Sequence, residues 1–314
     1  MHPQSHRYLS AILSAGSISK AAQTLGISQP SLSQFVQRIE KDLGAEVFDR
    51  STRPLTLTES GRIFFEAEKR VAEIREDCRR AVEDINGGGR GRVVIGASEY
   101  REMFFLTEVL PVFSAAHPGI EIALEEGTTR ELEDFVWTGK TDVSLVISPL
   151  AQPGLEAVEI YEERLLLAVN ERSPLVETAL ALCPEDRRAD EFPPFPFRLL
   201  ANQSFLVVRE GQQIHDLYRS LVAKAGASPK IVLESESLTA ALALAGAGLG
   251  ATIVTETLAR RSEAAKGVRF FSIDPAVPVR KVVAAYRPAR YLSKAARLLI
   301  KTMQEVAREK FARG

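Results

Sequence analysis

The sequence is poor in the residues that build metal centres and disulfide frameworks. Its 314 residues include only two cysteines, Cys78 and Cys183, and four histidines that are scattered along the chain. Two cysteines so placed form neither a metal-binding spacing nor a set of bridges, and dispersed histidines offer no paired ligands. We therefore expect no metal and no cofactor, and a reducing cytoplasm fits the composition.

Long apolar stretches are also absent. No run reaches the roughly 18–20 residues that a membrane helix needs, although 45% of the residues are hydrophobic. The N-terminus lacks the apolar core of a signal peptide, because Leu9, Ile12 and Leu13 recur at the spacing of one helical face. We expect a cytoplasmic globular protein of about two domains that has no membrane partner.

Net charge is nearly absent as well. Across the chain, 40 lysines and arginines balance 41 aspartates and glutamates. Residues 1–60 hold six basic and five acidic side chains, so this part carries only +1. Nonspecific attraction to nucleic-acid phosphates should therefore be modest for each subunit. The charge balance by itself does not suggest a DNA partner.

Near its start the sequence does contain two short helical patterns joined by a tight turn. Ser17 and Ser28 are suited to N-caps, and Gly26 is suited to the residue just past the first helix. Pro30 fits the first turn of the second helix, where its missing N–H costs nothing. An apolar stripe then runs through residues 32–43. This is the pattern of a helix-turn-helix, with an ordinary helical hairpin as the alternative.

The exposed start of the second helix is rich in amides and hydroxyls, which can read base edges in a major groove. The candidate DNA-binding residues in it are Ser28, Gln29, Pro30, Ser31, Ser33, Gln34 and Arg38. The next segment alternates apolar and polar residues and predicts a short hairpin, or wing, with Arg50 and Arg53 near its tip. We expect Gln29, Ser33 and Gln34 to contact bases. The three arginines are expected to contact phosphates.

The run AAQTLGISQPSLSQFVQRIEKDLGAEVFDRSTRPLTLTESG resembles the N-terminal winged helix-turn-helix of the LysR-type transcriptional regulators. The matching pieces are the pair Ala21–Ala22, the runs Ser28–Ser33 and Ile39–Gly44, the FDR tripeptide and the LTLTESG tail. Their order over about forty residues is specific. The resemblance implies a sequence-specific regulator that binds double-stranded promoter DNA at inverted-repeat half-sites. RNA polymerase is a further candidate partner.

Residues 59–86 are expected to form one long helix with an apolar seam. The seam residues recur alternately every three and four positions and are Phe64, Ala67, Val71, Ile74, Cys78, Ala81 and Ile85. A single helix cannot bury such a stripe, so we expect it to pair with its copy in a second subunit. Packing on the chain's own domains is the alternative. The resemblance likewise implies a homodimer through this helix, and homotetramers made of two dimers.

Beyond a glycine-rich hinge at residues 87–91, strand-like and helix-like segments alternate. This alternation predicts parallel sheets covered on both faces. The motifs GKTDVSLVIS, YEERLLLAVNERSPL and ALAGAGLGATIV resemble the effector-binding part of LysR-type regulators, an α/β domain with a periplasmic-binding-protein-like fold. The segment 177–202 departs from the family, because it is longer and richer in proline.

The predicted organisation has four parts in sequence. The parts are a winged helix-turn-helix domain at residues 1–58, a linker helix for dimerisation at 59–86, the hinge at 87–91, and an effector-binding domain at 92–314. Within the last part, we assign residues 92–166 and 269–314 to subdomain I, and residues 167–268 to subdomain II.

The chemistry of an enzyme is not indicated. Gly246, Gly248 and Gly250 resemble a phosphate-binding loop, but they follow a predicted helix and precede a strand. A dinucleotide fingerprint needs the opposite order of elements. No serine, histidine and aspartate stand in a catalytic arrangement, and we expect the protein not to be an enzyme.

A small-molecule site is the better hypothesis for the C-terminal part. Ligands of open α/β sheets bind beyond the carboxyl ends of the strands, against helix N-termini. The candidate effector-binding residues at such positions are Ser98, Glu99, Tyr100, Thr128, Thr129, Ser148, Glu210, Gln212, Glu236, Ser237 and Thr255. The resemblance supports the regions of Ser98, Thr128 and Ser148. The alternative for each residue is that it is a helix cap or a loop residue.

The charge of the ligand is left open by the sequence. Glu99 and Glu236 would disfavour a dicarboxylate if they faced the cleft, whereas Arg101 and Arg130 would favour one. We predict a regulator that responds to a small-molecule effector. The alternative is a DNA-binding regulator without a ligand response, whose C-terminal half serves only oligomerisation.

Overall fold

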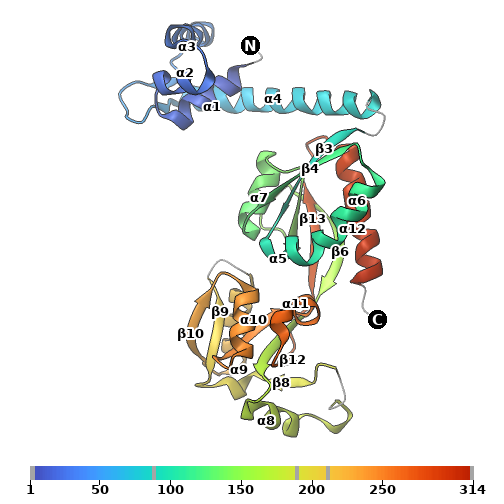
Figure 1. The fold of residues 1–314 in the computed structure, drawn as a ribbon. Helices are drawn as coiled ribbons and strands as arrows, with labels where there is room; N and C mark the ends of the chain where they lie inside the picture. The colour runs from blue at the N-terminus through green and yellow to red at the C-terminus, as the bar shows by residue number, and fades with distance from the viewer. Residues whose placement is uncertain (1–3, 87–89, 188–190, 210–212, 312–314) are drawn as a thin grey trace. The chain divides into compact units, whose positions relative to one another are not determined.

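The computed structural model describes residues 4–86, 90–187, 191–209 and 213–311 of the chain, and Figure 1 shows its ribbon. The chain divides into two compact units, residues 1–86 and 87–314. Three parts of the predictions, Glu210, Gln212 and hinge residues 87–89, lie outside the described residues.

The first unit contains helices that pack on one another and a small hairpin. Its elements are α1 (Ser5–Ala15), α2 (Ile18–Leu25), α3 (Gln29–Leu43), β1 (Phe48–Asp49), β2 (Thr56–Leu57) and α4 (Glu59–Asn86). Buried side chains of the first three helices and of the hairpin form a single core. Ser17 Oγ accepts a hydrogen bond from the Lys20 amide at 3.2 Å, and Gly26 ends α2 with a φ of 69°. The predicted helix-turn-helix is confirmed.

The hairpin β1–β2 is the predicted wing, and it is joined closely to α4. Phe48 pairs with Leu57 across the two strands. A Cβ added at Gly61, in the first turn of α4, would lie 2.0 Å from the carbonyl oxygen of Val47. Thr58 Oγ1 accepts a hydrogen bond from the Gly61 amide at 2.9 Å and caps the helix. These contacts hold the start of α4 against the wing.

The apolar stripe of α4 divides into two parts. Phe64 and Phe65 pack against the core of the first unit. Farther along the helix, Ile74 is 67% exposed and Ile85 is 83% exposed. Cys78 is also exposed in the single chain. Pairing with a second helix would be needed to make it a core residue. The later part of the stripe is therefore uncovered in one copy of the chain.

The second unit is built from two separate β-sheets with helices on their faces (Figure 1). Within the described residues, one sheet has the strand order β4-β3-β5-β13-β6 and the other has the order β10-β9-β11-β7-β12-β8. The strands are β3 (Gly91–Ala97), β4 (Ile120–Glu126), β5 (Val143–Ser148), β6 (Glu156–Glu163), β7 (Leu165–Asn170), β8 (Pro194–Pro196), β9 (Ser204–Val208), β10 (Lys230–Ser235), β11 (Ala251–Thr255), β12 (Val268–Asp274) and β13 (Arg280–Tyr286).

The helices of this unit cover both faces of each sheet. They are α5 (Glu99–Arg101), α6 (Thr107–Ala116), α7 (Thr129–Thr138), α8 (Pro174–Leu182), α9 (Gln213–Ala225), α10 (Leu238–Gly246), α11 (Glu256–Arg261) and α12 (Lys294–Lys310). The π-helix η1 (Glu102–Leu106) joins α5 to α6, and the short 3-10 turns are η2 (Glu185–Arg187), η3 (Phe197–Leu200) and η4 (Glu263–Ala265). The helical segment that runs into α6 therefore begins as a π-helix.

Each sheet has its own core. In the sheet that contains β3, helices α6 and α12 cover one face through side chains such as Phe113 and Leu299. Helix α7 covers the other face through Leu132. In the sheet that contains β7, α8 and α9 cover one face, and α10 and α11 cover the other through Leu242 and Leu258. The two sheets with their helices are called the first and second subdomains below.

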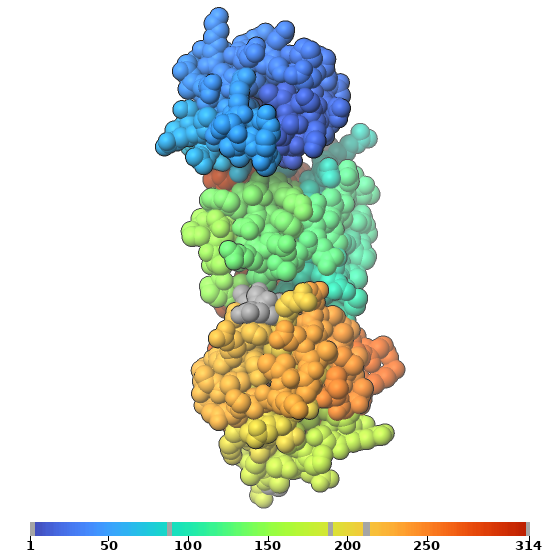
Figure 2. All heavy atoms as spheres, turned by 90° about the vertical axis from the view of Figure 1, so that its left-hand side faces the viewer, coloured from blue at the N-terminus to red at the C-terminus, as the bar shows by residue number. Residues whose placement is uncertain are grey.

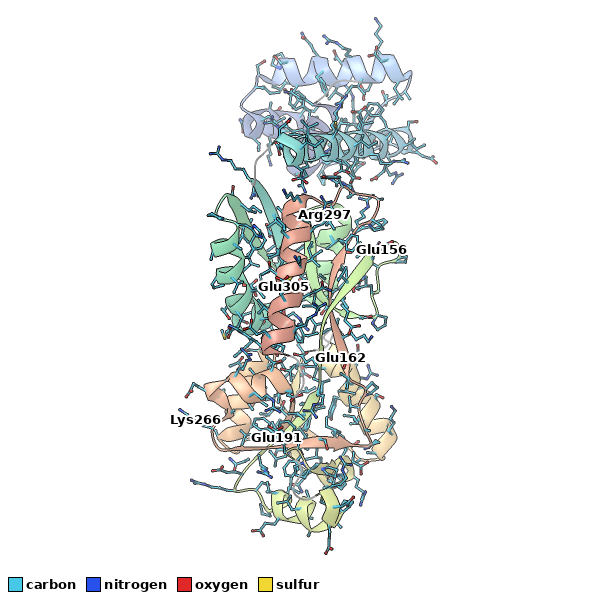
Figure 3. All side chains as sticks on the ribbon, turned by 90° about the vertical axis from the view of Figure 1, so that its right-hand side faces the viewer. Glu156, Glu162, Glu191, Lys266, Arg297 and Glu305 are labelled. Atoms are coloured by element: carbon cyan, nitrogen blue, oxygen red, sulfur yellow. The ribbon has the colours of Figure 1, made fainter. Side chains whose placement is uncertain are left out.

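The chain crosses between the subdomains twice, and the structure corrects the predicted boundaries. β6 leads through Arg164 directly into β7, so residues 165–166 belong to the second subdomain. Figure 3 labels Glu156 and Glu162 on β6, which carries the chain towards this crossing. β12 pairs antiparallel with β7, so the return crossing lies after residue 274 rather than before 269. Phe271 belongs to the second core, which explains why its strand stays in that sheet.

Both sheets are mixed, although the alternation of elements predicted parallel ones. β13 runs antiparallel to β5 and β6, and β7 runs antiparallel to β11 and β12. The crossing strands cause the difference, because each enters its sheet from the other subdomain instead of through a helical connection on the same sheet. The predicted hinge also ends too late, since Gly91 already pairs with Ile120 in the sheet.

The proline-rich segment 177–202 contributes to the core of the second subdomain. Its strand β8 pairs with β12 at the edge of the sheet, and Phe195 and Phe197 are fully buried. At its far side, Arg260 Nη2 donates to Glu191 Oε2 at 2.6 Å, and Figure 3 labels Glu191 in this part of the molecule. Arg260 also binds Glu256, which holds the crossing residue Arg164 in two hydrogen bonds of 2.6 and 2.7 Å.

Candidate functional sites

The start of α3 presents the predicted base-contacting groups on an exposed turn. Ser28 Oγ accepts a hydrogen bond from the Ser31 amide at 3.3 Å and caps the helix. Gln29 Nε2 donates to Ser33 Oγ at 2.8 Å, which orders both side chains on the surface. Gln29, Ser31 and Gln34 are exposed and Ser33 is half-buried. Pro30 lies in the first turn, where its ring disrupts no hydrogen bond of the helix.

The arginines predicted to contact phosphates differ in their surroundings. Arg50 Nη2 donates to Glu40 Oε2 at 2.8 Å, so part of its charge is balanced within the protein. Glu40 is held in place because its other oxygen accepts the Val47 amide at 3.0 Å. Arg53 Nη1 donates to the Thr52 carbonyl at 3.0 Å, which bends this side chain along the wing loop. Arg38 is exposed on α3.

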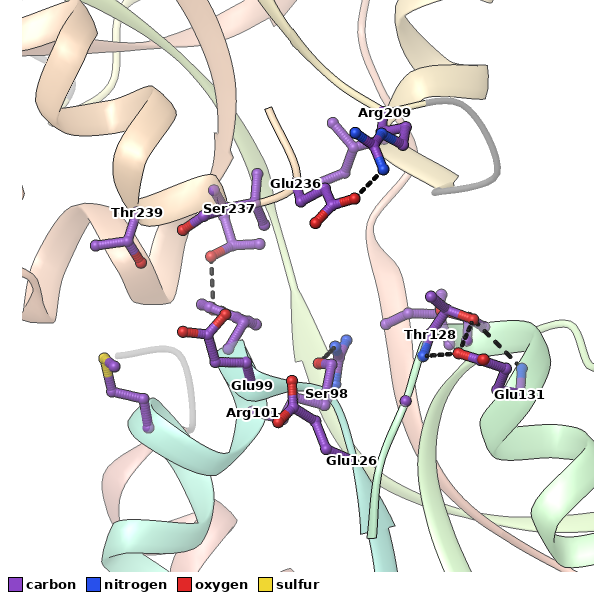
Figure 4. A pocket seen from close by; sticks show the side chains of 18 of the residues that line it. Ser98, Glu99, Arg101, Glu126, Thr128, Glu131, Arg209, Glu236, Ser237 and Thr239 are labelled. Atoms are coloured by element: carbon purple, nitrogen blue, oxygen red, sulfur yellow. Dashed lines mark hydrogen bonds and ion pairs between the residues drawn. The ribbon is translucent and has the colours of Figure 1, made fainter. Parts of the chain in front are cut away.

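A cavity of about 750 Å³ lies between the two subdomains, beyond the ends of strands from both sheets. The predicted residues that line it are Ser98, Glu99, Tyr100, Thr128, Thr129, Glu236, Ser237 and Thr255. Figure 4 shows this cavity from close by, and Figure 2 shows the level where the green residues of the first subdomain meet the orange residues of the second. Ser148 is not among the described lining residues, whereas its neighbour Ile147 is. Successive side chains of a strand point to opposite faces, which explains the difference.

Several lining hydroxyls are also helix caps. Thr128 Oγ1 accepts the Glu131 amide at 3.4 Å, and the Glu131 carboxylate accepts the Thr128 amide at 2.9 Å, a capping box at the start of α7. Ser237 Oγ accepts the Ala240 amide at 3.3 Å at the start of α10. The helix-cap alternative therefore describes these two residues correctly, and they line the cavity as well. Two helix N-termini from opposite subdomains thus meet the cavity wall, and each carries partial positive charge.

A buried polar cluster forms part of the cavity floor, and it connects the subdomains. Glu163 is fully buried and accepts hydrogen bonds from the Tyr100 hydroxyl at 2.9 Å and from Arg280 Nη2 at 2.5 Å. The Tyr100 oxygen also lies 2.6 Å from Thr255 Oγ1 in the second subdomain. Burial, with the nearby Glu163 charge, raises the pKa of Tyr100, so its phenol remains protonated. Arg101 is the fifth member, with its Nη2 3.8 Å from Glu163 Oε2.

Sequence reasoning missed several lining residues because their partners are distant in the chain. Arg280 meets Glu163 across 117 positions, at the two ends of strands beside the crossings. Arg209 pairs with Glu236 at the carboxyl ends of neighbouring strands β9 and β10 (Figure 4). Arg101 and Arg130, which the sequence suggested only as charges that could face the cleft, line it as well. The lining residues that the sequence did not suggest are Met103, Glu126, Gly127, Glu131, Ile147, Ile214, Leu238 and Thr239. These residues could have been found only by knowing which strand ends lie side by side in the fold.

The described part of the chain lacks the features of a metal centre and of a membrane-spanning helix. No group of His, Cys, Asp and Glu there has an arrangement that could hold a metal ion. No helix within the same residues is both long and apolar enough to cross a membrane.

Comparisons with known proteins cover nearly the whole sequence. Residues 4–62 match the family "Bacterial regulatory helix-turn-helix protein, lysR family", and residues 86–308 match the "LysR substrate binding domain". A Bacillus subtilis protein described as "Uncharacterized HTH-type transcriptional regulator YcgK" is 28% identical over 311 residues, which cover 98% of this chain and 95% of that protein.

Solved structures show a similar fold. A full-length OxyR variant from Pseudomonas aeruginosa has a TM-score of 0.69 and 22% identity, covering 98% of this chain and 97% of that one. Full-length CbnR in complex with its target DNA has a TM-score of 0.61 and 24% identity, covering 98% of this chain and all of the other (100%).

Proposed function

The chain belongs to the LysR family of transcriptional regulators, and from this premise we propose that its second unit binds a small-molecule effector that alters the contacts of the first unit with promoter DNA. The DNA-binding winged helix-turn-helix and the two-subdomain, periplasmic-binding-protein-like domain are the fold of this family. A cytoplasmic location follows from that role. The family consists of transcriptional regulators rather than enzymes.

The observation that carries the effector proposal is the cavity between the subdomains. Its volume of about 750 Å³ lies in the range of sites for small molecules. Polar groups converge on it from both sides, including the caps of α7 and α10, Thr128 and Ser237. The chain crosses between the subdomains at two places, so a ligand that contacts both walls would favour their closure. This explains why a ligand here could change the state of the whole unit.

The test is thermal unfolding of the full chain against a metabolite library. A ligand that binds only the folded protein raises the unfolding midpoint. Thr239→Trp should fill part of the cavity and abolish such a rise, while Lys266→Trp, at an exposed residue outside the cavity lining, should leave it intact. If no compound of any class shifts the midpoint or the affinity for DNA, the alternative holds, in which the second unit serves oligomerisation only.

For DNA, we propose that Gln29, Ser33 and Gln34 read bases, and that the helix cap Ser28 and its neighbours Pro30 and Ser31 also contact the DNA. The exposed polar surface at the start of α3 supports this assignment. The arginines of α3 and the wing would bind phosphates, with Arg50 contributing less than Arg38 because Glu40 already pairs with it. Salt titration of binding should show a smaller change in slope for Arg50→Ala than for Arg38→Ala. Equal changes would contradict the distinction.

For assembly, we propose a homodimer through α4, with two dimers forming a tetramer that holds both half-sites of an inverted repeat. The uncovered side chains Ile74 and Ile85 support it, because a second helix would bury them. Ile74→Glu should abolish the dimer in sedimentation and weaken promoter binding together. A matched change at an exposed polar residue of the helix, Arg70→Glu, should preserve the dimer. A folded Ile74→Glu protein that stays dimeric would refute the proposal. RNA polymerase is a further candidate partner of the DNA-bound protein at the promoter.

A further inference from the structure

We propose that the ligand of the cleft is a small monocarboxylate, whose carboxylate group binds the guanidinium of Arg101. This inference rests on the proposed function and specifies the chemical class of its effector. It assigns Arg101 the role of the ligand's anion partner. The sequence alone left the charge of the ligand open.

Arg101 is a buried cation with spare donors. Its side chain is 9% exposed and belongs to the lining of the cavity. Its Nη1 donates to Ser98 Oγ at 3.4 Å, which is a weak contact. No atom of the described residues accepts a hydrogen bond from its Nε or its Nη2. Buried donors of a charged group are costly without acceptors, so this arrangement favours a ligand that supplies them.

The nearby carboxylate of Glu163 does not fill that role. It already accepts hydrogen bonds from Tyr100 at 2.9 Å and from Arg280 at 2.5 Å. Its Oε2 lies 3.8 Å from Arg101 Nη2, which is beyond hydrogen-bond distance. One buried carboxylate thus faces two guanidinium groups. The floor of the cavity therefore carries one uncompensated positive charge.

The rest of the cavity sets an upper limit on the negative charge of a ligand. Glu99 and Glu126 line the first-subdomain wall, and neither forms an ion pair with a described residue (Figure 4). Their charges act on Glu102, whose pKa is raised by burial and then by Glu126 and Glu99. Across the cavity, Glu236 pairs with Arg209, so that wall is close to neutral. A second negative charge on the ligand would meet the first of these walls unfavourably.

A carboxylate fits these conditions better than a phosphate monoester. Both groups match the planar fork of an arginine. A phosphate monoester carries about −1.5 to −2 charges at neutral pH, whereas a carboxylate carries one. The buried floor holds one spare positive charge, and the first-subdomain wall holds Glu99 and Glu126 against one exposed cation, Arg130. This balance favours the singly charged group.

The experiment uses the full chain and probes that share a skeleton and differ in charge. The first set is benzoate, benzamide and phthalate, and the second is butyrate, butyramide and succinate. Phenyl phosphate tests the alternative oxyanion. We expect the monocarboxylates to raise the midpoint of thermal unfolding by about 5–10 °C at concentrations of about 100 times Kd. The amides, the dicarboxylates and phenyl phosphate should cause much smaller rises.

Variants connect this response to Arg101. Arg101→Met should lose the rise caused by monocarboxylates, and without ligand it should unfold at the same or a higher temperature than the wild type. Arg130→Met removes the same charge from an exposed lining residue and should keep most of the response. Arg280→Met should lower the midpoint without ligand, because Arg280 pairs directly with buried Glu163. A large loss of stability in Arg101→Met would show a structural role and overturn the proposal.

The outcomes also separate this inference from the proposed function. If amides or a neutral library compound stabilise the protein while monocarboxylates do not, the effector proposal survives and the carboxylate proposal is overturned. The same follows if dicarboxylates or phenyl phosphate stabilise it more than monocarboxylates do. If no compound of any class shifts the midpoint or DNA binding, both proposals are refuted.

Discussion

The polar side chains at the start of α3 and those on the floor of the cleft differ in how much water reaches them. Gln29, Ser31 and Gln34 are exposed, so water reaches each of them, and a base would reach them if α3 entered a major groove. Glu163 is fully buried and Arg101 nearly so. A substitution at the start of α3 should therefore change DNA binding without changing stability. A substitution in the cleft should change both ligand binding and stability. The following changes test that difference in order of expected size.

Glu163→Gln should have the largest effect, and it should act on stability. It removes the only carboxylate partner of Arg280 among the described residues and leaves the half-buried guanidinium of Arg280 and the buried one of Arg101 without a counter-charge. Breaking a buried pair in this way costs about 3–5 kcal/mol, measurable by urea unfolding. Glu162→Gln, at the exposed neighbouring residue, is the control and should change stability little. A Glu163 variant as stable as that control would remove the distinction between the two surfaces.

Gln29→Ala should affect binding and leave stability nearly unchanged. Loss of a base contact costs about 1–3 kcal/mol on the cognate site and much less on random DNA. Gln37→Ala makes the same replacement on the exposed face of the same helix and should have little effect on either. Fluorescence titration with both DNAs measures the difference. Equal losses on cognate and random DNA would show that Gln29 does not read bases.

Thr128→Val should reduce both stability and ligand binding, to a similar extent and by less than the changes above. It removes the hydroxyl that caps α7 and lines the cavity, and loss of an N-cap costs about 1 kcal/mol of stability. Thr128→Ser keeps the hydroxyl and should preserve both the stability and the ligand-induced rise in melting temperature. Urea unfolding and thermal shift measure the two effects. If the serine variant behaved like the valine variant, the hydroxyl would not be the group that matters.

Glu102→Gln should produce the smallest effect and should stabilise the protein. Its folded-state pKa is raised above the ordinary 4.5 by burial and by Glu126 and Glu99, and its buried Oε1 has no hydrogen-bond partner in the described chain. The folded protein therefore binds this proton more tightly than the unfolded one, and stability falls as pH rises from 4.5 through the folded pKa. At neutral pH the variant should gain less than about 1 kcal/mol.

The control for Glu102→Gln is to compare the variant with the wild type at low pH. Well below pH 4.5 the glutamate is protonated in both states, so the variant and the wild type should have similar free energies of unfolding. Urea unfolding at several pH values checks this convergence. A gain that persists unchanged at low pH would have another cause.

Local sequence determined the elements that could be predicted. The caps Ser17, Gly26 and Ser28 act within one helical turn, and each is found where its neighbours indicated. The long helix α4 has the predicted bounds for the same reason, because its periodicity is continuous and a threonine caps it. Eight predicted cleft residues also line the cavity, since strand ends and helix starts are readable from local pattern.

Contacts between distant segments could not be predicted in this way. Strand β6 escaped notice because its glutamates interrupt the apolar pattern, and its last residue is the buried Glu163. The partner Arg280 is separated from it by 117 positions. Residues 269–274 were assigned to the wrong subdomain because a strand's composition does not reveal which sheet it joins. The uncompensated charge of Arg101 depends on all of these placements, so only the fold shows it.

The central claim is that a ligand in the cleft changes how the regulator holds its promoter. The two units have separate cores, so the ligand is expected to act through assembly geometry and the spacing of half-sites. DNase footprinting of the full chain on its promoter, with and without a monocarboxylate that raises its melting temperature, tests this directly. We expect the protected region to shift or shorten while one half-site stays bound. An unchanged footprint, or release of the whole site, would contradict the account.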